Sequence, residues 1–238
     1  MRLAAGACSI LVAGALAACG VIPAPPGPLQ TNFVPDAVAS ASASQATSDG
    51  FSTEQHLAVR LRVTTCKGWG TGSGWILSDH EVVTNRHVIA GATSIEVTTY
   101  DGRELTALSS KVAKVADLGL VTLDSVFTET AKYQVSSLDA KTPITIVGYP
   151  EGQALTVEDG YYLSTTKDSV DATDQLVWML RAHVKPGNSG SAVYDDQGKV
   201  VAVVYAGDDQ QTTLAWPVSW LDELIKNPAD WQDNTTTC

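Results

Sequence analysis

The sequence predicts an all-β fold of short antiparallel strands, arranged as a barrel or a sandwich. Apolar side chains alternate with other residues over 57–63 and again over 95–99, which is the period of a strand with one buried face. Turn-forming residues separate such runs, as at 101–102 and 150–152. Many short strands at this spacing are typical of antiparallel barrels and sandwiches.

The expected strands can be placed in order along the chain. They cover residues 57–63, 73–78, 81–85, 95–99, 118–123, 144–146, 175–182, 192–194 and 199–205. After them, apolar side chains recur at helical spacing between Trp220 and Ile225. We therefore expect a short C-terminal helix at about 217–226.

Composition limits the classes of function that remain open. The chain has 238 residues, 44% of them hydrophobic and 17% charged, which is enough apolar material for one large domain or two small ones and excludes a wholly disordered chain. Its 15 basic and 26 acidic residues give a net charge of −11. Binding to nucleic acid, which needs clustered Lys and Arg, is therefore not expected.

The first 18 residues are typical of a secretory signal peptide. Arg2 supplies a positive charge, and the apolar stretch after it is too short and too rich in alanine and glycine for a membrane-spanning helix. The segment Leu16-Ala17-Ala18-Cys19 resembles the lipobox of bacterial lipoproteins. That resemblance implies cleavage before Cys19 and a lipid on its sulfur. The alternative is an ordinary cleavage site at small residues, with Cys19 incidental.

The export signal also affects how the next segment and the other cysteines are interpreted. Residues 19–54 are rich in proline, alanine and serine, so we expect a lipid-anchored tether. Once Cys8 has left with the signal peptide and Cys19 carries the lipid, Cys66 and Cys238 remain in an oxidising compartment. We expect a disulfide between them; two unpaired thiols are the alternative.

Three motifs supply the groups that acyl transfer by serine needs: a hydroxyl, an imidazole base, a carboxylate that orients the base, and main-chain amides for the oxyanion. Ser189 lies in a glycine-rich turn at 186–191, His87 follows a short strand, and Asp117 precedes an apolar strand. Each motif alone has a plainer explanation. The serine motif is common in turns, a single histidine is more often structural, and an aspartate at a strand start often faces water.

Together the motifs resemble trypsin-like serine proteases and, among them, the catalytic domains of bacterial HtrA-like proteases. The matching segments are Gly-Ser-Gly-Trp-Ile at 72–76, Val-Thr-Asn-Arg-His-Val at 83–88, Asp-Leu-Gly-Leu-Val at 117–121, Pro-Gly-Asn-Ser-Gly-Ser at 186–191 and Leu-Ala-Trp-Pro-Val at 214–218. The likeness covers about 55–226. It implies two antiparallel six-stranded barrels, at about 55–128 and 133–216, followed by the helix and a tail at 227–238.

The resemblance also implies roles for the site residues. His87 would be the base, Asp117 would orient it, and Ser189 would be the nucleophile. The amides of Gly187 and Ser189 would form the oxyanion hole, in a cleft between the barrels. The implied reaction is hydrolysis of peptide bonds through an acyl-enzyme, with no cofactor and no metal.

The same resemblance places a specificity pocket beside the nucleophile. Its expected lining residues are His183, Val204, Tyr205 and Ala206. No aspartate lies six residues before Ser189, so a preference for Lys or Arg in the substrate is not expected. Arg181, His183 and Lys185 alternate on one expected strand and share a face. That face suggests a pocket for acidic substrate residues; the alternative is a solvated face beside an apolar pocket.

The sequence departs from the family in two places. HtrA-like proteases usually carry a peptide-binding domain after the protease, whereas only about 12 residues follow Lys226 here, so we expect no such domain. Many secreted members are activated when a new amino terminus pairs with an aspartate before the nucleophile. Asn188 occupies that position, so activation by cleavage of a precursor is not expected.

The sequence thus predicts an extracytoplasmic serine endopeptidase that acts on proteins or peptides. We expect it to be anchored by its lipid to the outer face of a bacterial cell membrane or, alternatively, secreted. Two other functions stay open. One is a catalytically inactive surface-binding protein on the protease scaffold, and the other is an esterase that uses the same three side chains.

Overall fold

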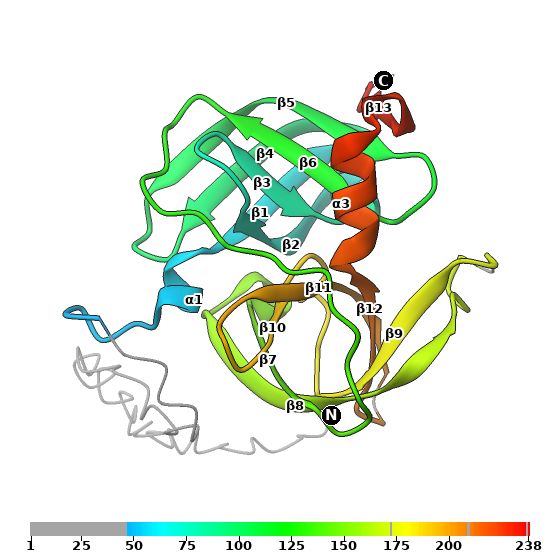
Figure 1. Cartoon of the computed structure of the whole chain (residues 1–238). Coiled ribbons are helices and arrows are strands. Elements are labelled where there is room, and N and C mark those ends of the chain that lie inside the picture. The colour runs from blue at the N-terminus through cyan, green and yellow to red at the C-terminus, as the bar shows by residue number, and fades with distance from the viewer. Residues whose placement is uncertain (1–46, 172, 209, 237) are drawn as a thin grey trace, which may run out of the picture. The chain divides into compact units, whose positions relative to one another are not determined.

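The fold is that of a computed structural model, and it describes residues 47–238 except 172, 209 and 237 (Figure 1). The signal peptide expected at 1–18, the lipid site at Cys19 and most of the tether expected at 19–54 lie outside the described residues. Within the described part of the chain, no helix has the length and apolar character needed to cross a membrane.

Six strands close the first barrel. They are β1 (Ala58–Thr65), β2 (Gly68–Ile76), β3 (Glu81–Thr84), β4 (Ala92–Thr99), β5 (Glu104–Ala113) and β6 (Gly119–Leu123). Neighbouring strands run antiparallel in the order β5-β4-β1-β2-β3-β6, and a further β5–β6 pairing closes the ring. In β1, Val59, Leu61 and Val63 are buried, whereas Arg62 and Thr64 are exposed. The period of two expected for this strand is therefore confirmed.

Six more strands form the second barrel. They are β7 (Pro143–Gly148), β8 (Thr156–Lys167), β9 (Leu176–Arg181), β10 (Ala192–Tyr194), β11 (Val200–Gly207) and β12 (Thr212–Pro217). They close in the order β10-β11-β12-β9-β8-β7. A separate apolar cluster that includes Ile146, Leu180 and Val201 fills this barrel. The prediction of an all-β fold with two antiparallel six-stranded barrels is confirmed.

The chain is already folded before residue 55, within the segment expected to be tether. Ser52 caps helix α1 (Thr53–His56) and exchanges hydrogen bonds with Gln55 in a capping box. The ring of His56 stacks on Tyr100 of the first barrel, with centroids 4.2 Å apart, and the ring of Phe51 meets Tyr100 edge-on. These contacts attach the start of the described chain to the first barrel.

The C-terminal segment leads the chain from the second barrel back to the first (Figure 1). Helix α3 (Val218–Lys226), expected from the sequence, buries Leu221 and Leu224. A 3-10 turn at 228–230 follows, and strand β13 (Trp231–Asp233) pairs with β5. The sequence did not predict β13. Beyond it, Cys238 forms a disulfide with Cys66, with 5.6 Å between the Cα atoms.

Candidate active site

His87 lies in helix α2 (Arg86–Ile89), a single turn that follows β3 after Asn85. Its ring Nδ1 is 2.6 Å from Oδ2 of Asp117, and its main-chain amide donates to Oδ1 of the same carboxylate at 2.8 Å. An ionised carboxylate only accepts hydrogen bonds, so the proton of a neutral ring is assigned to Nδ1. Nε2 is then the ring atom that can accept a proton from a substrate or nucleophile.

Asp117 is buried, with 4% of its surface exposed, in the turn that leads into β6. A buried carboxylate requires hydrogen-bond donors, and His87 supplies two of them. The carbonyl oxygen of Asp117 accepts a further hydrogen bond from the side-chain amide of Asn85 at 2.8 Å. Helix α2 and the Asp117 turn are therefore joined at three points, which fixes the imidazole relative to the carboxylate.

Ser189 lies in the turn between β9 and β10, and this turn contacts β2 of the first barrel. Its carbonyl accepts a hydrogen bond from the Ser73 amide at 2.8 Å. A Cβ built on Gly72 would lie 2.6 Å from a methyl group of Val88 and 3.2 Å from the Ser189 carbonyl oxygen. The Ser189 turn and the residue after His87 therefore meet across Gly72, where only a glycine fits.

The Ser189 hydroxyl donates to the carbonyl of Tyr205 at 3.5 Å. Within the described residues it makes no hydrogen bond to His87. Catalytic hydrogen bonds are often long or unformed without substrate, and a rotation about the Ser189 Cα–Cβ bond would turn the hydroxyl away from Tyr205. The structure therefore brings His87 and Asp117 into direct contact, and the turn that carries Ser189 approaches Val88, the residue after His87, across Gly72.

In the described part of the chain, neither the Gly187 amide nor the Ser189 amide donates a hydrogen bond to another main-chain group. The peptide groups around them are held from both sides. Ser73 Oγ donates to the Gly187 carbonyl at 2.7 Å, and the Glu151 amide donates to the Pro186 carbonyl at 2.5 Å. Gly187 has a φ of 95°, in the region that favours glycine.

Ser73 is a site residue whose role the sequence did not reveal. It is fully buried between the barrels, and its hydroxyl also accepts a hydrogen bond from the Tyr149 amide at 2.8 Å. One hydroxyl thus connects β2, the turn after β7 and the turn that carries Ser189. The Gly-Ser-Gly motif marked Ser73 as a residue of interest in the sequence. Its hydrogen-bond partners, Tyr149 and Gly187, could not be inferred because they are 76 and 114 residues away.

A second pair that the sequence analysis missed involves Tyr205, whose carbonyl accepts the hydrogen bond from the Ser189 hydroxyl. The phenol of Tyr205 donates to the carboxylate of Asp168 at 2.7 Å, and Asp168 is only 2% exposed. Burial, followed by this hydrogen bond, raises the pKa of Tyr205. The phenol therefore stays protonated. It attaches β11, which bears the acceptor of the Ser189 hydroxyl, to the loop after β8.

The hollow beside Ser189 has a volume of about 220 Å³. Its lining residues are Val184, Lys185, Pro186, Asn188, Ser189, Val204, Ala206, Gly207 and Asp208. Val204 and Ala206, both expected in the pocket, therefore line it, whereas Tyr205 turns toward Asp168.

His183 lies outside that hollow. With Arg181 it lines a separate depression of about 490 Å³ that also contains Glu158 and Asp159. Arg181, His183 and Lys185 are all exposed, but the strand expected to carry all three ends at Arg181, so the prediction that they share one strand face is wrong. Of these, only Lys185 reaches the hollow at Ser189, where it lies 3.9 Å from a carboxylate oxygen of Glu151.

Comparison with known proteins places the chain in a family. A family model described as a trypsin-like peptidase domain matches residues 72–203. The chain belongs to the trypsin-like peptidase family. It is 32% identical over 148 residues to the serine protease Do-like HtrA of Bacillus subtilis, a match that covers 56% of this chain and 33% of that protein. The serine protease Do-like HtrA of Lactobacillus helveticus is 30% identical over 128 residues, covering 51% and 31%. The chain thus spans about a third of the length of these two curated relatives.

Solved structures share the fold. The Rv3671c protease from M. tuberculosis, in its active form, superposes with a TM-score of 0.66 at 21% identity, covering 78% of this chain and 85% of that chain. The HtrA-type protease AlgW with tripeptide gives a TM-score of 0.66 at 24% identity, covering 78% and 61%. At this identity the likeness establishes only the fold of the chain.

Proposed function

We propose that the protein is an extracytoplasmic serine endopeptidase that cleaves proteins or peptides through an acyl-enzyme. The observation that carries this proposal is the contact between Asp117 and His87. The buried carboxylate holds both the main-chain amide and the ring Nδ1 of His87. This leaves Nε2 as a base beside the turn that carries Ser189. An orienting carboxylate of this kind stabilises the imidazolium that forms during catalysis.

In the proposed reaction, Ser189 Oγ attacks the peptide carbonyl carbon as its proton passes to Nε2 of His87. The Gly187 and Ser189 amides donate to the oxyanion of the tetrahedral intermediate. When the C–N bond breaks, His87 returns the proton to the leaving amine. Water then attacks the acyl ester with His87 again as base, and the hydroxyl of Ser189 is restored.

The test is active-site labelling with a fluorophosphonate probe together with hydrolysis of an unfolded protein substrate. The wild-type protein should be labelled once and should cleave the substrate, whereas Ser189→Ala should do neither. Ser94→Ala is the matched control, because Ser94 is an exposed serine on β4. Folded wild-type protein that is never labelled would overturn the proposal and favour a catalytically inactive binding protein. Labelling with ester turnover but no peptide cleavage would favour an esterase.

We further propose that the residue before the cleaved bond is small and apolar. Val184, Val204 and Ala206 supply apolar walls to the hollow beside Ser189, and apolar walls favour apolar side chains. A Cβ on Gly207 would clash with a methyl group of Val184, so the walls are closely packed. Peptides with Val or Ala at this position should be cleaved faster than peptides with Glu or Lys; a preference for Glu would contradict this and restore the acidic hypothesis.

We also propose that the mature protein is anchored through a lipid on Cys19. The lipobox-like segment supports this, and the Cys66–Cys238 disulfide suits an oxidising compartment outside the cytoplasm. Wild-type protein should incorporate a palmitate label and sediment with membranes. Cys19→Ala should abolish the label and release the protein, and an unlabelled wild type would exclude the anchor.

A further inference from the structure

Helix α2, which carries His87, is too short to hold its own position. Its four residues form a single turn, and at its C-terminal end the Ala90 amide donates a hydrogen bond to the Arg86 carbonyl. A single helical turn is unstable in isolation, and its last carbonyl groups have no partner within the helix. The orientation of His87 therefore depends on groups outside α2.

The N-terminal end and the buried side of α2 are held by neighbouring elements of the first barrel. Asp117 binds the His87 amide, and Asn85 binds the Asp117 carbonyl. On the buried side, Ile89 is fully enclosed and packs so closely on Gly119 that a Cβ there would lie 2.7 Å from it. These contacts do not involve the carbonyl and amide groups at the C-terminal end of the helix.

The C-terminal end of α2 is held by Asn234, which comes from the tail after β13. The side-chain nitrogen of Asn234 donates to the Ile89 carbonyl at 2.7 Å, and its side-chain oxygen accepts from the Gly91 amide at 2.9 Å. The same nitrogen donates to the hydroxyl of Ser110 in β5 at 3.0 Å. Asparagine offers a donor and an acceptor side by side, so one side chain satisfies both a carbonyl and an amide at the helix end.

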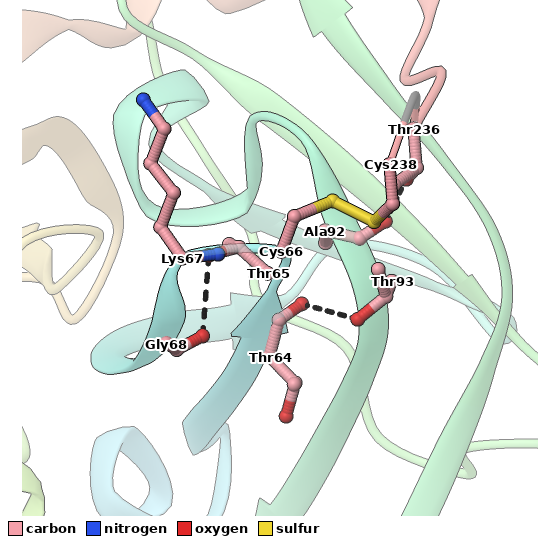
Figure 2. Close-up of a disulfide and its surroundings, with 9 residues drawn as sticks. All are labelled: Thr64, Thr65, Cys66, Lys67, Gly68, Ala92, Thr93, Thr236 and Cys238. Carbon is pink, nitrogen blue, oxygen red and sulfur yellow. Dashed lines mark hydrogen bonds between the residues drawn. A yellow bond between two sulfur atoms is a disulfide. The ribbon is translucent and has the colours of Figure 1, made fainter.

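The tail that brings Asn234 to this place is attached on both sides of it. Before it, Trp231 is buried and donates its indole N–H to the Leu224 carbonyl at 3.0 Å. After it, the Thr236 hydroxyl donates to the Ala92 carbonyl, and Cys238 is bonded to Cys66 (Figure 2). Figure 2 shows the disulfide joining the tail to the β1–β2 turn beside Ala92 and Thr93. Asn234 is thus held between two anchors.

We propose that Asn234 is a positioning residue for His87. It acts through α2: Asp117 fixes the N-terminal end of the helix and Asn234 fixes its C-terminal end, so that the imidazole faces the Ser189 turn. The inference rests on the proposed function of His87 as the base. A displacement of about 1 Å in a catalytic group can cost about 10²-fold in rate, so loss of one end of the helix has a measurable effect.

The experiment compares Asn234→Ala, Asn234→Asp and the control Gln232→Ala in the full-length protein. Asn234→Asp keeps an acceptor for the Gly91 amide but places an oxygen against the Ile89 carbonyl. Gln232 is an exposed residue of β13. Three quantities are measured well below the unfolding temperature: kcat, KM, and the downfield proton NMR signal of the His87 Nδ1–H in its hydrogen bond to Asp117.

We expect both Asn234 variants to lose about 10- to 100-fold in kcat with little change in KM, and their His87 signal to broaden or move. Gln232→Ala should match the wild type. Folded Asn234 variants with wild-type kcat and an unchanged signal would overturn the proposal, since a purely structural role would lower only the unfolding temperature. If Asn234→Ala does not fold, Asn234→Asp decides the matter by the same criteria.

Failure of the proposed function is distinguishable from failure of this inference. If the wild-type protein cleaves no protein or peptide substrate, the proposed function is refuted. The NMR signal still reports whether Asn234 holds the His87–Asp117 pair, and an unchanged signal in the variants overturns the positioning role on its own.

Discussion

Removal of the Cys66–Cys238 disulfide should strongly destabilise the protein. The bridge closes a loop with a sequence separation of 172, so it restricts nearly the whole folded chain in the unfolded state. The chain-entropy relation gives about 5 kcal/mol at 25 °C for a loop of this length, as an upper value. In a domain of this size the loss corresponds to a fall in the unfolding temperature of about 10–20 °C.

Urea unfolding of oxidised protein, reduced protein and the Cys66→Ser/Cys238→Ser double variant measures this directly. Reduced wild type and the double variant should unfold at the same, lower urea concentration. The folded state should survive, because β13 remains paired with β5 and Trp231 remains buried. Equal midpoints and slopes for oxidised and reduced protein would refute the reasoning, because they would mean that the bridge does not restrict the unfolded chain.

Three further predictions concern the site. Asp117→Asn should lower kcat by about 10⁴-fold, because an amide stabilises neither the correct ring tautomer nor the imidazolium; steady-state kinetics with unchanged kcat would contradict this. Ser73→Ala removes the buried hydroxyl that donates to the Gly187 carbonyl. We expect kcat to fall by up to about 10²-fold, which is less than the effect of losing an oxyanion donor outright. A change in KM with unchanged kcat would contradict this expectation. Tyr205→Phe removes a hydrogen-bond donor to buried Asp168. The free energy of unfolding, measured with urea, should therefore fall by about 2 kcal/mol. A variant with the wild-type urea midpoint would exclude a stabilising role for that hydrogen bond.

The sequence predicted strands in which apolar residues alternate clearly, as in β1, and missed β5, β8, β12 and β13. The alternation in β1 is clear because its apolar residues face the barrel interior. In β5 and β8, most residues are exposed or half-buried, so their side chains carry little hydrophobic pattern. These strands are specified by pairing with neighbours distant in sequence, and a local pattern does not record that pairing.

The candidate active site likewise contains residues that could be recognised from the sequence and residues that could not. The groups of the proposed chemistry, at His87, Asp117 and Ser189, could be recognised because acyl transfer demands those residue types. The residues that hold them in place could not, because a buried serine, tyrosine or asparagine has many possible partners. Which partner Ser73 or Asn234 takes depends on how the barrels and the tail pack, and that is a property of the folded chain.

The three residues of the proposed site come from both barrels, so their relative positions depend on how the barrels pack. His87 and Asp117 both belong to the first barrel, and their direct contact is independent of the second. The Ser189 turn belongs to the second barrel, and the Ser73 amide and hydroxyl bind two of its carbonyls. The position of the Ser189 turn relative to His87 is therefore set where the barrels meet. Substitutions at Ser73 should therefore slow the proposed attack by Ser189 and leave the NMR signal of the His87 Nδ1–H, which reports the contact with Asp117, unchanged.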